Sequence, residues 1–214
     1  MARRPPAAPA RKRADRYHHG DLRRALLQAA VRTIGDHGID ALTLRGVGSA
    51  LGVSRTALYR HFRDKAALLA AMGAEGFRTL RAELSESWER GGRGQRGFKA
   101  MGVAYVQFAV AHPSHYRVMF GEHHAMFGAD IFGAEYPDLA QESTGAFQVL
   151  VDGIVELQGR HLARRDDPRQ MAMFVWATTH GVAMLAIDGR LGREASAIDG
   201  LTHYMTERVL AAIA

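Results

Sequence analysis

TLRGVGSALGVSRTALYRHFRDK, the stretch from Thr43 to Lys65, predicts two short helices joined by a tight turn, with a third helix beginning just beyond it. Gly52 supplies the backbone freedom that a sharp reversal needs, and Ser54 can cap the second helix. Apolar residues at helical spacing can point into one small core: Leu44, Val47, Leu51, Val53, Leu58 and Phe62. The outward face of the second helix then carries Arg55, Thr56, Tyr59, Arg60 and His61. This layout is typical of a DNA-reading helix-turn-helix, and the alternative is a helical hairpin in an ordinary all-α protein.

Composition narrows the class of protein. At 214 residues, of which 47% are hydrophobic, the chain has room for one large domain or two small ones. It has no run of 18 apolar residues, and its basic N-terminus has no apolar segment, so we expect neither a membrane span nor a secretory signal. The lack of cysteine excludes disulfides, thiolate catalysis and cysteine-ligated zinc, and it fits the cytoplasmic location that we expect.

The charge is unevenly distributed along the chain. Residues 1–65 hold 14 Lys and Arg against 5 Asp and Glu, whereas residues 66–214 hold 14 against 17. A basic N-terminal third on a mildly acidic remainder is what a phosphate-binding head on a separate body would show. A chance cluster with a basic tail is the alternative.

Three segments are expected: a disordered basic arm at 1–16, a helix-turn-helix domain at 17–65 and a larger helical body at 66–214. The arm either follows DNA or makes no contacts. Periodicity, caps and breakers predict an all-α fold of nine helices without a sheet. Beyond the helix capped by Thr43 and the one capped by Ser54, helices are expected from about 20 to 37, from the Asp64 cap to the break at Gly91, and at 95–112, 114–120, 139–164, 168–188 and 195–213, with a loop at 121–138.

The chain resembles the TetR family of bacterial transcriptional regulators. The resemblance is strongest in Leu42-Thr43-Leu44, Gly52-Val53-Ser54, Ala57 to Phe62, and Asp64-Lys65 followed by Leu68-Leu69. Further parts of the chain are similar to one subgroup of this family. At the start these are Tyr17-His18-His19-Gly20-Asp21-Leu22-Arg23, and in the body they are Tyr105-Val106-Gln107-Phe108, His112-Pro113, Tyr116 to Gly121, and the series Trp176, His180, Gly181. The family usually has Ile-Ala where this chain has Val47-Gly48, and Gly46 precedes them, which suggests a softer head because glycine in a helix costs about 1 kcal/mol against alanine.

The resemblance implies a homodimer with a DNA head of three helices and a body that binds a small-molecule effector and dimerises. Binding of the effector would change the spacing of the two heads and release a near-palindromic operator in double-stranded DNA. Most members of the family repress transcription and some activate it. We expect a repressor and no enzymatic activity.

The expected DNA contacts lie at the helix starts and on the second helix of the motif. Backbone N–H groups at the start of the helix that follows Thr43 favour an anion, and Arg45 lies beside them. Arg55 and Thr56 are the candidates for base edges, whereas Lys65 matches the family's phosphate-contacting lysine. Each could instead be a solvated surface residue. The full set is Thr43, Arg45, Ser54, Arg55, Thr56, Tyr59, Arg60, His61 and Lys65.

Aromatic and methionine side chains of the body could line a cavity for an apolar ligand, or could simply form the core. The expected ligand-binding set is Met101, Tyr105, Phe108, Tyr116, Met119, Phe120, Phe147, Phe174, Trp176 and His180. Trp176 and His180 lie one turn apart and share a helix face. The last two helices are expected to form the dimer interface, with small residues such as Gly181 and Ala183 permitting close approach.

Other sites are not expected. The cluster of His112, His115, His123 and His124 lacks the spacing of a metal-binding helix, so we expect no metal and no cofactor. No GxSxG motif or other recognisable catalytic arrangement occurs, which argues against an enzyme. An architectural DNA binder without ligand control remains an alternative, although it would not need so large an apolar body.

Overall fold

The computed structural model describes residues 19–121, 135–192 and 194–214, and these form nine α-helices without a strand. The all-α expectation is therefore confirmed for this part of the chain. The proposed arm at 1–16 and most of the loop expected at 121–138 lie outside it. In chain order the helices are α1 (His19–His37), α2 (Leu44–Ala50), α3 (Arg55–His61), α4 (Lys65–Arg90), α5 (Gln95–Ala111), α6 (Pro113–Phe120), α7 (Pro137–Gly159), α8 (Pro168–Ile187) and α9 (Ala195–Ile213).

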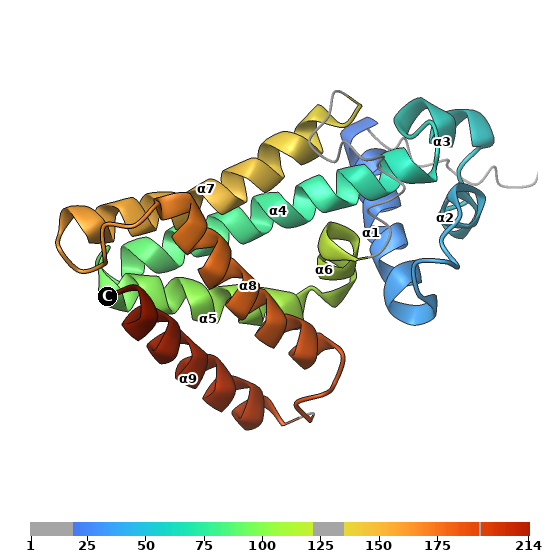
Figure 1. Cartoon of the computed structure of the whole chain (residues 1–214). Helices are drawn as coiled ribbons and strands as arrows, with labels where there is room; N and C mark the ends of the chain where they lie inside the picture. The colour runs from blue at the N-terminus through green and yellow to red at the C-terminus, as the bar shows by residue number, and fades with distance from the viewer. Residues whose placement is uncertain (1–18, 122–134, 193) are drawn as a thin grey trace, which may run out of the picture.

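Helices α1 to α3 form a head at one end of the molecule (Figure 1). Its boundaries follow from local chemistry, because Thr43, Ser54 and Asp64 each accept a hydrogen bond from the backbone N–H three residues later. Gly52 closes the turn between α2 and α3 with a φ of +64°, which is costly for any residue with a Cβ. Leu26, Leu42 and Leu58 are buried here, and they belong to one apolar core that continues into the body.

Helix α4 runs out of the head and along the body, where it packs against α5, α6 and α7. Helix α5 packs in turn against α8 and α9, so the body is a bundle of long helices with α6 as a short one near the head. Glu142 of α7 is buried and forms ion pairs with Arg78 and Arg81 of α4, at 2.9 and 3.2 Å. These pairs lock α7 onto α4 beside the apolar core.

Two glycines let α6 and α7 approach α4 closely. A Cβ at Gly73 would lie 2.9 Å from Leu139 Cδ1, and a Cβ at Gly76 would lie 2.4 Å from Met119 Sδ. Both distances are shorter than any ordinary carbon contact. Gly73 and Gly76 therefore serve helix packing, although their helix propensity is poor.

Helix α7 ends earlier than its sequence pattern suggested. It stops at Gly159, whereas periodicity predicted a helix to Arg164. His161 has a φ of +58°, and the Leu162 N–H bonds back to the Leu157 carbonyl, which reverses the chain. Apolar residues beyond Gly159 continue the helical spacing, which is why the sequence pattern predicted a longer helix. Ala163 is buried because the chain reverses here, and not because the helix continues.

Helix α8 is long and apolar enough to cross a membrane by length and composition alone, and 39% of its most apolar window is buried inside the protein. A core helix of a soluble protein passes the same test, so this is weak evidence for a membrane span. Here α8 packs against α5, α7 and α9.

Candidate DNA-binding and effector-binding sites

Helix α3 presents the side chains that the sequence assigned to DNA. Arg55, Thr56, Tyr59 and Arg60 are exposed, with 43% of the Tyr59 surface accessible, while Leu58 on the opposite side is buried. Helix α3 therefore has one face in the core of the head and one face free for a groove of DNA. His61 is half-buried at the end of the helix.

The starts of α2 and α3 are suited to phosphate. Thr43 Oγ1 and Ser54 Oγ accept hydrogen bonds from Gly46 N and Ala57 N, at 3.0 and 3.2 Å. Because each hydroxyl accepts the cap bond, its own proton stays free to donate to an anion. Arg45 is exposed in the first turn of α2, so a phosphate there would meet a hydroxyl, a guanidinium and the helix N-terminus.

Lys65 has a structural partner that the sequence did not reveal. Its Nζ donates to the Ile39 carbonyl oxygen at 2.8 Å, which ties the start of α4 to the chain between α1 and α2. An ammonium group has three donors, so two remain for a phosphate. The residue thus joins parts of the head and also stands where the resemblance placed a phosphate contact.

A second link joins the head to α7. Arg63, between α3 and α4, forms an ion pair with Glu135 and donates to the Tyr136 hydroxyl at 3.1 Å. The guanidinium also lies over the Tyr136 ring, 5.5 Å from its centroid. The hydrogen bond to Tyr136 and the nearby carboxylates raise the pKa of Arg63, so the link keeps its positive charge.

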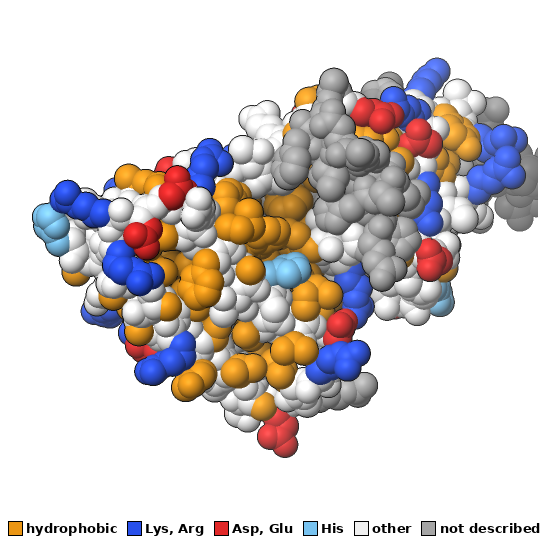
Figure 2. Space-filling model, viewed as in Figure 1, with side chains coloured by type: hydrophobic (Ala, Val, Ile, Leu, Met, Phe, Trp, Pro, Cys, Tyr) orange, Lys and Arg blue, Asp and Glu red, His pale blue; other side chains and the backbone are white. Residues whose placement is uncertain are grey.

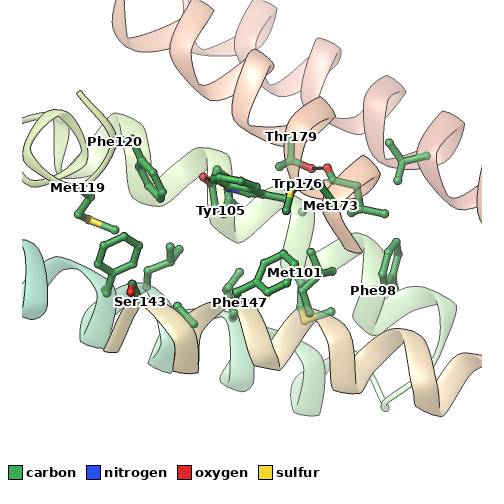
Figure 3. Close-up of a pocket in the computed structure, with 18 of the residues that line it drawn as sticks. Phe98, Met101, Tyr105, Met119, Phe120, Ser143, Phe147, Met173, Trp176 and Thr179 are labelled. Atoms are coloured by element: carbon green, nitrogen blue, oxygen red, sulfur yellow. Dashed lines mark hydrogen bonds between the residues drawn. The ribbon is translucent and has the colours of Figure 1, made fainter. Parts of the chain in front are cut away.

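The body contains an apolar cavity of about 520 Å³ that is partly open to solvent and lies between α4, α5, α6, α7, α8 and α9. Figure 3 shows Tyr105 and Trp176 on one wall, with Phe147 and Met101 on the other. Its lining is Phe77, Leu80, Leu84, Phe98, Met101, Gly102, Tyr105, Met119, Phe120, Ser143, Thr144, Ala146, Phe147, Leu150, Arg169, Met173, Val175, Trp176, Thr179, Met205, Thr206 and Val209. A cavity of this size and composition suits a small apolar molecule.

Four side chains from three helices form a hydrogen-bonded cluster at the cavity wall. Trp176 Nε1 donates to the Tyr105 hydroxyl at 3.0 Å, and the Tyr116 hydroxyl lies 3.1 Å from that of Tyr105. His180 Nδ1 lies 2.6 Å from the Tyr116 hydroxyl and 3.2 Å from the Tyr105 hydroxyl. The Tyr116 and His180 rings also stack, with centroids 5.5 Å apart. We call these four residues the polar cluster.

Burial sets the protonation of the polar cluster. Loss of solvent raises the pKa of Tyr105 to about 12, and it also raises the pKa of Tyr116. The same loss lowers the pKa of His180 because it disfavours the imidazolium form. All four side chains are therefore uncharged near neutral pH.

The structure distributes the expected effector-binding residues over four places. Met101, Tyr105, Met119, Phe120, Phe147 and Trp176 line the cavity. Tyr116 and His180 lie outside its lining and contact it through the polar cluster, and Phe108 is fully buried in the core. Phe174 is 49% exposed on the outer surface of α8 and is not among the residues that line the cavity.

Several lining residues had no recognisable signal in the sequence. Thr179, Thr206 and Arg169 are polar, and Leu80, Val175 and Met205 looked like ordinary core. The spacing i, i+3 from Trp176 to Thr179 could have placed Thr179 on the same face. The others depend on how distant helices cross, which periodicity does not give.

The outer face of α8 is apolar and has small residues at its centre. Phe174, Ala177, Gly181 and Leu185 are exposed at helical spacing, and nothing lies within 4 Å of a Cβ built on Gly181. We call these four residues the α8 face. Figure 2 shows hydrophobic side chains gathered across the body while Lys and Arg lie around the margin. By contrast Ala183, which the sequence placed among the interface residues, is fully buried inside the protomer.

A metal site is not formed by the histidines that can be described. His112 and His115 lie edge to face with centroids 6.1 Å apart, while His123 and His124 fall outside the described residues. Within residues 19–121, 135–192 and 194–214, no group of three potential metal ligands comes together.

Family comparisons agree with both halves of this architecture. Residues 26–72 match the family described as bacterial regulatory proteins, tetR family, and residues 98–209 match the tetracyclin repressor-like C-terminal domain. The second match alone covers more than half of the chain. The protein belongs to the TetR family and is a DNA-binding transcriptional regulator.

Solved structures extend the similarity to most of the chain. A protein of unknown function from Rhodococcus sp. RHA1 is 31% identical, with a TM-score of 0.78 over 94% of this chain and 99% of that one. The TetR-family regulator PfmR from Thermus thermophilus shares the fold, with 15% identity and a TM-score of 0.65 over 87% and 97% of the two chains.

Curated relatives match over a shorter stretch. The HTH-type transcriptional repressor Rv1474c from Mycobacterium tuberculosis is 38% identical over 68 residues, which are 32% of this chain and 36% of that protein. The tetracycline repressor protein class C from Escherichia coli is 41% identical over 58 residues, which are 27% and 26% of the two chains. The chain thus matches only about a third of the length of the first repressor and about a quarter of the length of the second.

Proposed function

We propose that this protein is a cytoplasmic, homodimeric repressor that leaves its operator when a small apolar molecule enters the cavity. The observation that carries this proposal is the apolar cavity of about 520 Å³ in the body of a protein whose head binds DNA. An architectural DNA binder has no use for such a cavity. Two heads related by a two-fold axis would recognise a near-palindromic site.

The head would use two classes of contact. Arg55 and Thr56, exposed at the first turn of α3, would read base edges in the major groove, with Arg60 serving either purpose. Phosphate contacts would come from the two helix starts and from exposed or partly exposed side chains that carry a donor. That second set is Thr43, Arg45, Ser54, Tyr59, His61 and Lys65.

Helix α6 is the element best placed to couple the two sites. Met119 and Phe120 line the cavity, while Ser114 at the other end of α6 is buried beside Gly35 of α1. A ligand that pushes on Met119 would move a helix that contacts the head. Such a ligand shifts the equilibrium toward the DNA-released state by a free energy equal to the difference between its binding free energies for the two states.

The α8 face, together with the exposed side of α9, would form the dimer interface. Both helices bury one side in their own protomer; α8 leaves the apolar α8 face exposed, and α9 exposes small and aromatic residues such as Gly200 and Tyr204 together with charged ones such as Glu207. Four such helices can pack around a two-fold axis.

Two measurements test this function in sequence. Bound sites are first selected from random duplex DNA, and a repressor of this kind should select one near-palindrome. Release of that labelled duplex is then followed by fluorescence anisotropy while small apolar compounds are added. An architectural protein would select no preferred site, and a ligand-independent regulator would stay bound with every compound that fills the cavity.

A further inference from the structure

The hydroxyl groups in the cavity wall are mostly turned away from a ligand. Of the four Ser and Thr residues in the lining, Ser143, Thr179 and Thr206 each donate to a carbonyl oxygen of their own helix, at 2.8–3.1 Å. Their hydroxyl protons are therefore already used. A ligand meets mainly carbon and sulfur in this wall.

Charge is confined to the mouth of the cavity. Among the described lining residues Arg169 is the charged one, and it is exposed in the first turn of α8 with a hydrogen bond to Gln148 Oε1. The lining contains no carboxylate among the described residues. An ion that entered the interior would lose its water without gaining an opposite charge, which is strongly unfavourable.

The histidine of the polar cluster can carry its proton on either ring nitrogen, and the choice decides where the tyrosine protons go. Tyr105, Tyr116 and His180 Nδ1 form a triangle with three short contacts, of which the 2.6 Å contact between Tyr116 and His180 is the shortest. If His180 carries its proton on Nε2, the Tyr116 hydroxyl donates to Nδ1 and the Tyr105 hydroxyl can donate to the Tyr116 oxygen at 3.1 Å. If His180 carries its proton on Nδ1, that proton goes to Tyr116, the Tyr116 proton goes to Tyr105, and the Tyr105 proton finds no acceptor in the triangle.

The tautomer with the proton on Nδ1 thus leaves the Tyr105 proton free for an acceptor in the cavity, which Tyr105 lines. Trp176 Nε1 donates to the Tyr105 oxygen in either tautomer, because an indole nitrogen cannot accept. This bond and the burial of the ring hold the Tyr105 hydroxyl in place. An acceptor on a ligand would therefore meet a hydroxyl oxygen that is already held in place, and it would favour the tautomer that frees the Tyr105 proton.

We infer that the cavity takes an uncharged, mainly apolar molecule with one hydrogen-bond acceptor, such as the oxygen of a ketone, ester or ether, and that the Tyr105 hydroxyl donates to that acceptor. The inference rests on the proposed function, because it assigns the chemical class of the effector. The raised pKa of Tyr105 agrees with it, since the hydroxyl remains a donor throughout the physiological range.

Four naphthalene probes of nearly equal shape test this inference. They are 2-acetylnaphthalene, its hydrocarbon counterpart 2-ethylnaphthalene, the anion 2-naphthoate and the cation 2-naphthylmethylammonium. Binding to the full-length protein is measured by isothermal titration calorimetry at neutral pH. The ketone should bind most tightly, and both ions should bind about 100-fold more weakly or not at all because nothing in the interior compensates their desolvation.

Tyr105→Phe isolates the proposed hydrogen bond. The substitution should weaken the ketone by roughly three- to tenfold, the range of one neutral hydrogen bond, and should leave 2-ethylnaphthalene unchanged. The hydrocarbon is the matched control, because any general change in the cavity moves both probes equally. Equal losses for both probes would show that Tyr105 only shapes the cavity and would overturn the inference.

Two other outcomes would also overturn it. Binding of 2-naphthoate as tightly as the ketone, with loss of that binding in Arg169→Gln, would show that an anionic head is recognised at the mouth. Failure of all four probes to bind would show that the cavity does not accept molecules of this class.

Other outcomes separate the proposed function from the inferred class of ligand. If 2-acetylnaphthalene binds through Tyr105 but leaves the affinity for the selected operator unchanged, release by ligand is wrong and the chemical class of the cavity stands. If an anion releases the operator through Arg169, release stands and the chemical class is wrong.

Discussion

Gly181→Arg should convert the protein into monomers without unfolding it. Gly181 lies at the centre of the α8 face, and its built Cβ has no neighbour within 4 Å, so an arginine fits the isolated protomer without strain. In the proposed dimer the same position faces its symmetry mate. Two unpaired guanidinium groups would then enter one apolar interface.

The magnitude follows from the symmetry. An arginine that partly reaches solvent still loses about 2–3 kcal/mol when its charge is desolvated without a partner. A two-fold interface contains two copies, so the dimer should lose about 5 kcal/mol, roughly four powers of ten in its dissociation constant. Operator binding should fall with it, because a single head makes half the contacts.

Sedimentation velocity at micromolar protein concentration gives the oligomeric state, and thermal unfolding followed by circular dichroism checks the fold. Ala177→Arg, one turn away on the α8 face, should behave in the same way. Ala82→Arg is the matched control, because Ala82 is an exposed residue of α4 on another part of the surface. Intact dimers for both α8 variants would refute the proposed interface. Ala183→Arg is unsuitable for this test, since Ala183 is fully buried and a charge there would disrupt the protomer itself.

Three further predictions concern the head and the polar cluster. Arg55→Ala should cost about 1–3 kcal/mol on the selected operator and relax the preference at one base pair per half-site; selection of an unchanged sequence by the variant would show that Arg55 does not read a base. Lys65→Ala should weaken binding to specific and non-specific DNA alike and reduce the salt slope by about one unit. Loss of the 2.8 Å bond to the Ile39 carbonyl should also lower the free energy of unfolding. An unchanged slope in a salt titration would leave Lys65 with its structural role alone. Burial lowers the pKa of His180 from 6.5, so the unfolded chain takes up a proton first and the free energy of unfolding should fall as the pH drops below about 6.5. His180→Gln should flatten this pH dependence in urea titrations. An equally steep dependence in the variant would assign it to other groups.

The parts of the fold that could be predicted are those set by local chemistry. Thr43, Ser54 and Asp64 cap their helices as expected, because a side-chain acceptor before a helix satisfies one of its orphan N–H groups. Gly52 and Gly189 lie in turns with positive φ, where glycine is favoured. These signals depend on four or five neighbouring residues, so one sequence contains all of the necessary information.

The direction of side chains on α8 could not be predicted, for a physical reason. This helix is apolar on nearly all sides, so hydrophobic periodicity does not tell which side meets the core. Phe174 and Ala183 were both assigned from the sequence without knowledge of that side; one lies on the outer surface and the other in the core. The crossing of α8 over α5 decides both, and this depends on residues about 70 positions apart, such as Tyr105 and Trp176.

The glycines of α2 show that packing has to be weighed beside helix propensity. Two glycines in a helix of seven residues suggested a head weakened by about 1 kcal/mol at each position. However, a Cβ at Gly48 would lie 3.1 Å from Leu58 Cδ2, and a Cβ at Gly46 would lie 2.9 Å from the capping Thr43 Oγ1. Alanine at Gly48 would press on the buried leucine that joins α2 to α3, and alanine at Gly46 would disturb a cap worth about 1 kcal/mol. Part of the propensity gained by alanine would thus be offset by strain at these two contacts.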